Sequence, residues 1–211
     1  MTRTYETKPA AKVTPERFEQ GLTLRQFIDR MTKNQEVFEE HYRTFALDPE
    51  DAAFFKKLGR KLNVLVLAED WCGDVLRYLP AFWHIAQAAG SWNVRVFYRD
   101  QNPDLAGMWL KNGTHRAIPV FVFFDEGMNE LAHFIEKPAE VDQAELAARS
   151  RFALMHPELA DGSLPPAEMS ATTRELYASY IREFRAANRL QWQELFVKKI
   201  RELLAGVAAC A

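Results

Sequence analysis

The sequence predicts an α/β fold in which a mixed central sheet is flanked by helices. The run from Asn63 to Ala68 is short and almost continuously apolar, as expected of a strand covered on both faces. Between residues 62 and 154 the pattern reads strand, helix, strand, helix, strand, strand, helix. This order requires parallel strands joined by helical crossovers, followed by an antiparallel hairpin. With 211 residues, 48% of them hydrophobic and 27% charged, the chain has the composition of one soluble domain.

Two regions precede this core. Residues 1–20 are polar and lack periodicity, so we expect a flexible arm there. Residues 21–61 are expected to form N-terminal helices. Thr23 begins a capping box with the glutamine three residues later, and Asp48 before Pro49 is typical of a second helix start.

The elements of the core, residues 62–154, follow in order along the chain. Strands are expected at 63–68, 94–98, 120–124 and 131–135, and helices at 75–89, from 102 to about 113, and from 138 to about 153. Gly90 is expected to end the first of these helices.

Helical periodicity returns after a proline-rich link. Aromatic and aliphatic residues at Tyr177, Tyr180, Ile181 and Phe184 predict C-terminal helices over residues 165–209. We expect these helices to pack on the core, so that residues 1–211 form a single domain. An alternative is that their apolar face forms a homodimer contact.

Several function classes are disfavoured by composition. The formal net charge of -2 argues against a nucleic-acid partner bound through bulk electrostatics. The longest apolar run, residues 117–124, is far too short for a membrane span. The absence of an apolar signal segment in the first 20 residues, together with only two cysteines, leads us to expect a cytoplasmic protein. The five histidines show no metal-ligand spacing, so no metal site is expected.

The candidate catalytic residues lie in the segment from Glu69 to Asp74, between the first core strand and the helix that follows it. Cys72 is expected at the helix N-terminus, where unpaired N–H groups and the helix dipole favour a thiolate and lower the thiol pKa. Gly73 leaves space beside the sulfur for a partner. The three nearby carboxylates act in the opposite direction, because negative charge disfavours a thiolate.

This segment resembles the active site of the thioredoxin superfamily. Trp71-Cys72-Gly73 follows a hydrophobic strand, and Pro80 lies eight residues after the cysteine, in the order and spacing of that family. Ile118-Pro119, at the start of a later strand, resembles the cis-proline loop that faces the cysteine and lines the substrate groove. The acidic Trp-Cys-Gly-Asp version is similar to a bacterial thioredoxin-like branch. The resemblance implies a thioredoxin-like fold with helical extensions at both ends.

The chain departs from this family at the second cysteine, whose place is taken by Val75. A dithiol cycle cannot run within the motif. Val66 also stands where the family usually has a buried aspartate. We therefore expect a monothiol thiol-disulfide oxidoreductase acting through Cys72, with protein or small-molecule disulfides and thiols as partners. It would use an external low-molecular-weight thiol as reductant and no cofactor. The alternative is a redox-inactive thioredoxin-fold module that binds proteins.

Other residues around the motif have two interpretations each. Asp74 either exchanges protons during thiol chemistry or stabilises the helix start. Trp71 is expected to be a partly exposed aromatic residue over the site, with substrate contact as a secondary role. Arg116 either supplies positive charge to Cys72 or to a bound carboxylate, or is a solvated loop residue. Cys210 either resolves a Cys72 disulfide or is incidental in a terminal tail.

Overall fold

The computed structural model describes residues 13–58 and 60–209, without the side chains from residue 207 onward. Its contacts divide the chain into two compact units. The core unit ends at Glu136 and resumes at Ile200, and the helical unit is Lys137–Lys199. Cys210 and the first twelve residues lie outside the described residues. Whether the two units unfold as the single domain expected from sequence stays a prediction.

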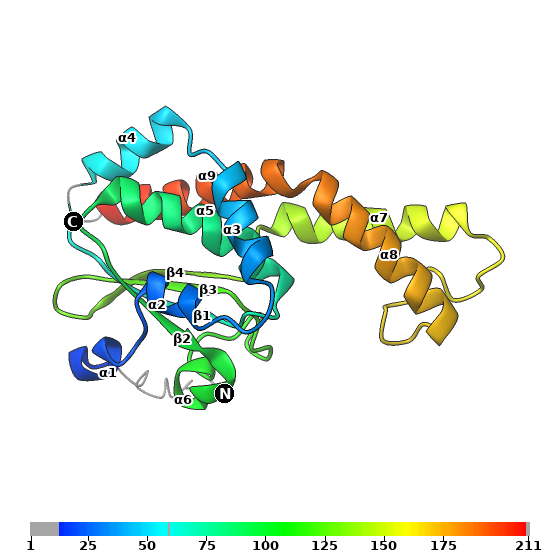
Figure 1. Ribbon diagram of the computed structural model, residues 1–211, viewed down its shortest axis with the longest axis horizontal. Coiled ribbons are helices and arrows are strands. Elements are labelled where there is room, and N and C mark those ends of the chain that lie inside the picture. Colours follow the sequence, from blue (N-terminus) through cyan, green and yellow to red (C-terminus); the bar gives the residue numbers. More distant parts are fainter. Residues whose placement is uncertain (1–12, 59, 210–211) are drawn as a thin grey trace, which may run out of the picture. The chain divides into compact units, whose positions relative to one another are not determined.

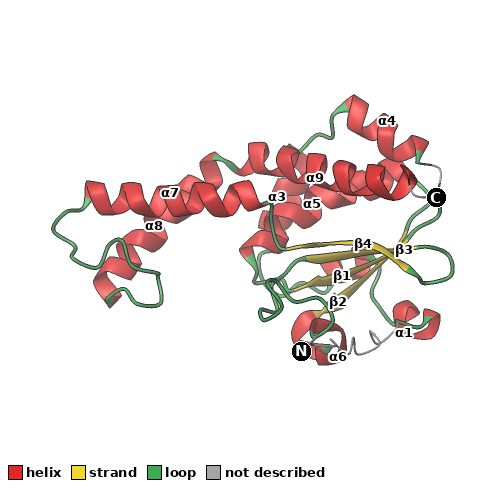
Figure 2. Cartoon of the chain, turned by 180° about the vertical axis from the view of Figure 1, so that it is seen from behind, coloured by secondary structure: helices red, strands yellow, loops and turns green. Residues whose placement is uncertain are grey.

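The core unit contains the mixed sheet that the sequence predicts (Figure 2). Its strands are β1 (Asn63–Ala68), β2 (Asn93–Tyr98), β3 (Val120–Phe124) and β4 (Glu130–Ile135), in the spatial order β2-β1-β3-β4. β1 is parallel to β2 and antiparallel to β3, and β3 and β4 form the antiparallel hairpin. The predicted α/β architecture is confirmed.

Burial explains the almost continuous apolar runs of the two central strands. Every residue of β3 is buried, as is every residue of β1 after Asn63. On one face, Phe82 of the following helix packs on Phe121 with a ring-centroid distance of 4.6 Å. A central strand that is covered on both faces has no side facing solvent, so its sequence need not alternate between apolar and polar residues.

Three helices lie together on one side of the sheet (Figure 1). They are α3 (Gln35–Thr44), α4 (Pro49–Lys57) and α5 (Gly73–Ala89). The Tyr42 ring stacks on His84 at 4.4 Å, which joins α3 to α5. α5 runs through Pro80 and ends at Gly90, as predicted; the φ of Gly90, 71°, is the left-handed conformation common at helix C-termini.

The expectation of a flexible arm over residues 1–20 is wrong for its described part. α1 (Pro15–Glu19) begins at Thr14, whose hydroxyl accepts the Arg17 N–H. Phe18 is only 1% exposed. This short segment is held in place by the proline at the first helical position, the buried Phe18 ring and the ion pairs Arg17–Asp104 and Glu19–Arg95.

A close approach to β2 follows α1. Leu22 exchanges two backbone hydrogen bonds with Val96, of 2.9 and 2.7 Å. Gly21 makes this approach possible, because a Cβ at that position would lie 2.6 Å from the Phe97 ring. α2 (Leu24–Asp29) then begins with the predicted capping box at Thr23.

The connection between β2 and β3 differs from the prediction. It contains a 3-10 turn, η1 (Arg99–Gln101), and a short helix, α6 (Pro103–Ala106). The helix ends at Ala106 and does not continue to the Asn112-Gly113 pair. In place of further helix, the Lys111 N–H donates to the His115 carbonyl oxygen at 2.8 Å, forming a turn around that pair.

The helical unit contains α7 (Ala139–Met155), α8 (Ala171–Ala187) and the first part of α9 (Arg189–Ala209). Its apolar centre is formed by Ala148, Phe152, Met169, Tyr177 and Ile181. Within the described residues, no helix combines the length and apolar character needed to cross a membrane.

Candidate active site around Cys72

Cys72 lies where β1 passes into α5. Its backbone has the extended conformation of a helix N-cap, with φ -82° and ψ 120°, and its side chain does not cap the helix. The Cys72 N–H donates to the Glu69 carbonyl oxygen at 3.2 Å, which closes the turn between strand and helix. The sulfur is therefore held at the first turn of α5, as the sequence predicts.

A second segment brings the Ile118 carbonyl to this sulfur. The Ile118-Pro119 peptide bond is cis, and the Cys72 Sγ–H donates to the Ile118 carbonyl oxygen at 3.6 Å. The Glu136 N–H donates to the Pro119 carbonyl oxygen at 2.7 Å and so ties this loop to the end of β4. The two motifs that carry the sequence resemblance are in contact.

The electrostatics of Cys72 differ from the expectation. Burial is the largest effect and raises the pKa of the thiol. The N–H groups of Val75 and Asp74 lower this pKa, as expected at a helix start, whereas the carboxylates of Asp74 and Glu136 raise it further. The net direction is upward, so the expected lowering of the thiol pKa is wrong. Donation to Ile118 also favours the neutral thiol, because a thiolate has no proton to donate.

Asp74 occupies the position at which a carboxylate stabilises a helix start, and it is also paired with a nearby arginine. It lies in the first turn of α5, and its Oδ1 accepts a 2.5 Å hydrogen bond from Arg77 Nη1. Both side chains are largely buried, at 16% and 7% exposure. A buried carboxylate needs such a partner, because an unpaired charge would be strongly disfavoured there. Arg77 thus fixes a negative charge close to Cys72.

Trp71 forms an exposed wall of the site. Its side chain is 46% exposed, in agreement with the sequence interpretation, and the Arg99 guanidinium lies 5.1 Å from its ring centroid. Arg99 Nη1 also donates to the Arg116 carbonyl oxygen at 3.1 Å. Arg99 therefore connects Trp71 to the loop that leads to Ile118.

Arg116 and Gly73 are both exposed. The Arg116 side chain makes no hydrogen bond or ion pair with a described residue, so both of its expected roles stay open. A Cβ placed on Gly73 would meet no atom within 4 Å. The side of the sulfur next to Gly73 is therefore open to an approaching molecule.

The two acidic residues before Trp71 are turned away from the thiol chemistry. Asp70 Oδ2 accepts the N–H groups of Thr32 and Lys33 at 2.8 and 3.1 Å, and fixes the turn before α3. Glu69 Oε1 accepts the Asp100 N–H at 2.8 Å. Desolvation raises the pKa of the Glu69 carboxyl.

Sequence reasoning missed three charged residues that act on the site. Glu136 is distant in sequence and is brought near by β4, and Arg99 comes from the end of β2. No local pattern identifies either of them. Arg77 could have been identified from the sequence, because a residue three positions after Asp74 lies on the same face of the helix. Among the described residues, no cluster of three or more His, Cys, Asp or Glu side chains is arranged to hold a metal ion.

A mixed sheet with a cysteine at a helix start, facing a proline loop, defines a thioredoxin-like α/β protein. Residues 21–151 match the thioredoxin family, and the chain belongs to it. No protein of curated function matches the chain.

Two solved structures share the fold along nearly the whole chain. A protein of unknown function from Pseudomonas aeruginosa is 16% identical, covers 90% of this chain over 95% of its own length, and has a TM-score of 0.60. An HIV epitope scaffold is also 16% identical, with the same coverage of each chain and a TM-score of 0.56. At this identity the likeness shows the fold alone.

Proposed function

We propose that the protein is a monothiol thiol-disulfide oxidoreductase that acts through Cys72. The observation that carries the proposal is the position of the sulfur, at the first turn of α5 and 3.6 Å from the Ile118 carbonyl oxygen. The open side at Gly73 gives a disulfide access to it. Membership of the thioredoxin family supports a redox role.

The reaction is an exchange in two steps. The Cys72 thiolate attacks one sulfur of a disulfide R–S–S–R′, a Cys72–S–S–R bond forms, and the old bond breaks to release R′S⁻, which takes a proton from water. An external thiolate R″S⁻ then attacks the R sulfur and releases the Cys72 thiolate with R–S–S–R″. The sum is R–S–S–R′ plus R″SH giving R–S–S–R″ plus R′SH. The external thiol takes the place of a second cysteine in the motif.

Each neighbour of the sulfur has a part in this scheme. The N–H groups of Val75 and Asp74 favour the thiolate that attacks and later leaves. In this scheme Trp71 and Arg116 flank the bound disulfide, and the loop at Ile118 and Pro119 lies beneath it. In the same scheme the Arg116 guanidinium attracts a carboxylate on a small thiol.

A redox-inactive binding module is the second candidate, and the raised pKa of Cys72 favours it. In that function the groove between Trp71 and Ile118 holds a protein segment and the thiol takes no part. The two candidates differ in one property, which is whether Cys72 forms a mixed disulfide in the folded chain.

We further propose that the partners are protein or small-molecule disulfides and thiols in the cytoplasm. A reducing compartment supplies the external thiol that the second step consumes. A homodimer formed through the helical unit is also compatible with this scheme, and size-exclusion chromatography with light scattering measures it directly.

The test uses the full chain carrying Cys210→Ser, so that Cys72 is its single thiol. Incubation with bis(2-hydroxyethyl) disulfide should add one mercaptoethanol adduct at Cys72, seen by mass spectrometry. An added external thiol should remove the adduct and restore the original mass. The matched control, Cys72→Ser with Cys210 retained, should fold alike by circular dichroism and carry no adduct at position 72.

The decisive comparison is between the folded and the denatured chain. If the Cys72 adduct forms only after denaturation, the oxidoreductase proposal is wrong and the binding module is the better account. The same holds if the full chain does not accelerate thiol-dependent reduction of a protein disulfide relative to Cys72→Ser.

A further inference from the structure

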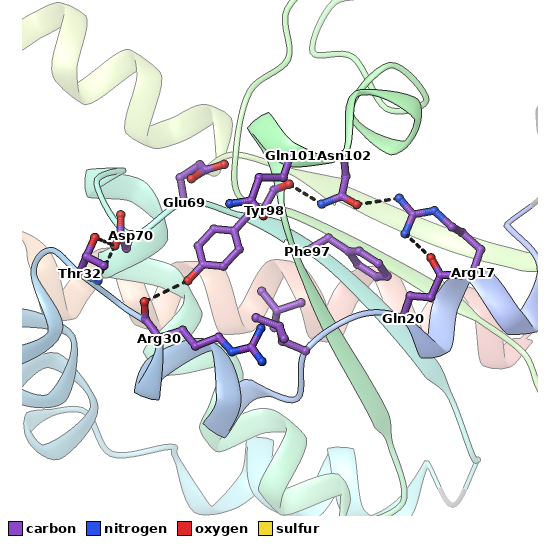
Figure 3. Close-up of a pocket in the computed structure, with 12 residues that line it drawn as sticks. Arg17, Gln20, Arg30, Thr32, Glu69, Asp70, Phe97, Tyr98, Gln101 and Asn102 are labelled. Carbon is purple, nitrogen blue, oxygen red and sulfur yellow. Dashed lines mark hydrogen bonds between the residues drawn. The ribbon is translucent and has the colours of Figure 1, made fainter.

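A polar groove is lined by residues of β2, of the segments that flank α2 and of the turn after β1 (Figure 3). Cys72 is not among its lining residues. The groove has a volume of about 620 Å³, within the range of small-molecule sites. Leu22, Val96 and Phe97 supply apolar lining, and Tyr98 contributes its ring. The groove also carries carboxyl groups and guanidinium groups, so charge determines which ligands fit.

The acidic lining contains a buried carboxyl group that is only partly satisfied. Glu69 is 7% exposed, and its Oε1 accepts the Asp100 N–H. Its Oε2 accepts no hydrogen bond from a described residue. Oε2 is not one of the fully buried polar atoms that lack a partner among the described residues, so it reaches the groove and can accept a donor from a ligand. Thr32 and Lys33 donate to Oδ2 of Asp70, which also lines the groove, while its Oδ1, like Oε2 of Glu69, accepts no hydrogen bond from a described residue.

The basic lining contains one guanidinium that has a partner and one that has none among the described residues. Arg17 is engaged by both carboxylate oxygens of Asp104 and by Asn102 Oδ1, at 3.0, 3.1 and 2.7 Å. Arg30 is exposed, and its guanidinium makes no hydrogen bond or ion pair with a described residue. Arg30 is therefore the group in the groove that remains to bind an anion.

Figure 3 shows the Glu69 carboxyl and the Arg30 side chain on opposite sides of Tyr98. We propose that the groove binds a zwitterionic short peptide, with its terminal ammonium on Glu69 and its terminal carboxylate on Arg30. A ligand that reaches both groups lies along Tyr98. The ammonium supplies the donor that Glu69 Oε2 lacks, and the carboxylate matches the planar guanidinium fork.

The charge state of Glu69 agrees with this assignment. Desolvation raises the pKa of its carboxyl, which means that burial disfavours the charged form. A bound ammonium would stabilise that charged form. Gln101 also lines the groove, and its amide can donate to or accept from the peptide backbone of the ligand.

The experiment titrates triglycine, N-acetyl-triglycine and triglycine amide into the full chain by isothermal titration calorimetry. Triglycine has no side chains, so the two blocked forms differ from it only at one terminus each. Triglycine should bind, and each blocked form should bind roughly tenfold more weakly, as expected for loss of one charge-assisted contact.

Variants assign each terminus to its residue. In Glu69→Gln, triglycine and N-acetyl-triglycine should bind with equal affinity, and in Arg30→Gln triglycine and its amide should do so. The matched controls are Glu126→Gln and Arg25→Gln, which alter exposed ion-paired residues outside the groove lining and should bind as the unchanged chain does. Circular dichroism verifies that each variant is folded.

Three results would overturn the inference. The first is no binding of triglycine at millimolar concentration, and the second is equal binding of the free and blocked peptides. The third is a loss of affinity on blocking either terminus that persists unchanged in both Glu69→Gln and Arg30→Gln. Cys72→Ser should bind triglycine normally, so this result is separate from the outcome of the proposed thiol chemistry.

Discussion

The Cys72 sulfur and the Ile118 carbonyl oxygen lie 3.6 Å apart, although 46 positions separate the two residues in the chain. This contact joins the start of α5 to the loop before β3. The contact also affects the electrostatics of the thiol. The partly negative carbonyl oxygen faces the sulfur and accepts a hydrogen bond from the thiol S–H. The contact that builds the site thus opposes ionisation of its nucleophile.

Alkylation of Cys72 should be slower than that of a free cysteine at neutral pH. The pKa of the thiol is raised in the folded chain, so the thiolate fraction at a given pH is smaller than in a free thiol and grows as pH rises. The rate with iodoacetamide, measured against pH in the Cys210→Ser chain, should rise at higher pH than that of N-acetylcysteine. A Cys72 curve displaced to lower pH would contradict the burial argument.

Removing a nearby negative charge should accelerate this alkylation at neutral pH. The Asp74 and Glu136 carboxylates both raise the pKa of Cys72, so Asp74→Asn and Glu136→Gln should each enlarge the thiolate fraction. The asparagine keeps an oxygen for Arg77. Glu126→Gln removes a charge from an exposed turn and is the matched control. Equal rates in all chains would show that charge has no influence at the sulfur.

Two glycine substitutions should separate the access of disulfides to Cys72 from the stability of the folded chain. A Cβ at Gly73 meets open space, so Gly73→Ala should change stability by less than about 1 kcal/mol while slowing exchange with bulky disulfides. Gly21→Ala places a Cβ 2.6 Å from Phe97 and should cost roughly 1–3 kcal/mol without altering exchange in the folded chain. Urea denaturation and adduct formation measure the two effects. An unchanged exchange rate in Gly73→Ala would mean that disulfides approach from another side.

Asp161 should make the chain more stable above about pH 4 than near pH 2. Its carboxylate accepts the Ser170 N–H at 2.6 Å and the Thr173 hydroxyl at 2.5 Å, and these bonds lower its pKa to about 2. The stabilisation by this carboxylate is fully present above its pKa in the unfolded chain, about 3.9. It is lost as the pH falls through its pKa in the folded chain. Asp161→Asn should therefore lower the melting temperature near pH 6. The difference from the unchanged chain should shrink toward pH 2, and a constant difference would exclude the carboxylate charge as its cause.

Deleting residues 165–211 should lower the melting temperature or cause aggregation. The deleted segment includes Ile200 and Leu204, which are 0% and 2% exposed, and Arg201, which pairs with Asp51 at 2.7 Å within the core unit. Their loss uncovers apolar surface in that unit. Differential scanning calorimetry measures the effect. An unchanged melt with retained solubility would show that the segment is an independent appendage.

Much of the fold could be predicted because the signals that define it are local. The apolar runs of β1 and β3, the cap at Gly90 and the capping box at Thr23 each act within a few residues. α1 was missed although Thr14-Pro15 is a recognisable helix start. A single apolar residue, Phe18, has no periodicity, and its burial depends on packing that the local sequence does not specify.

The residues that form the candidate site could be predicted from the sequence, but the electrostatics of the site could not. Cys72 and Ile118 meet as the resemblance implies. The sign of the thiol pKa shift could not be predicted, because it depends on how deeply the tertiary structure buries the sulfur and on the distant Glu136. The pairing of Arg99 with Trp71 is likewise a product of the sheet, which brings the end of β2 beside the end of β1.

The pair of hydrogen bonds between Leu22 and Val96 has a consequence for self-association. β2 is the last strand on its side of the sheet, and an uncovered outer strand invites pairing with the same strand of another molecule. Leu22 occupies the N–H and the carbonyl of Val96 near the middle of that strand. Gly21, by permitting this close approach, lets the segment after α1 cover part of the strand edge with which another molecule would pair.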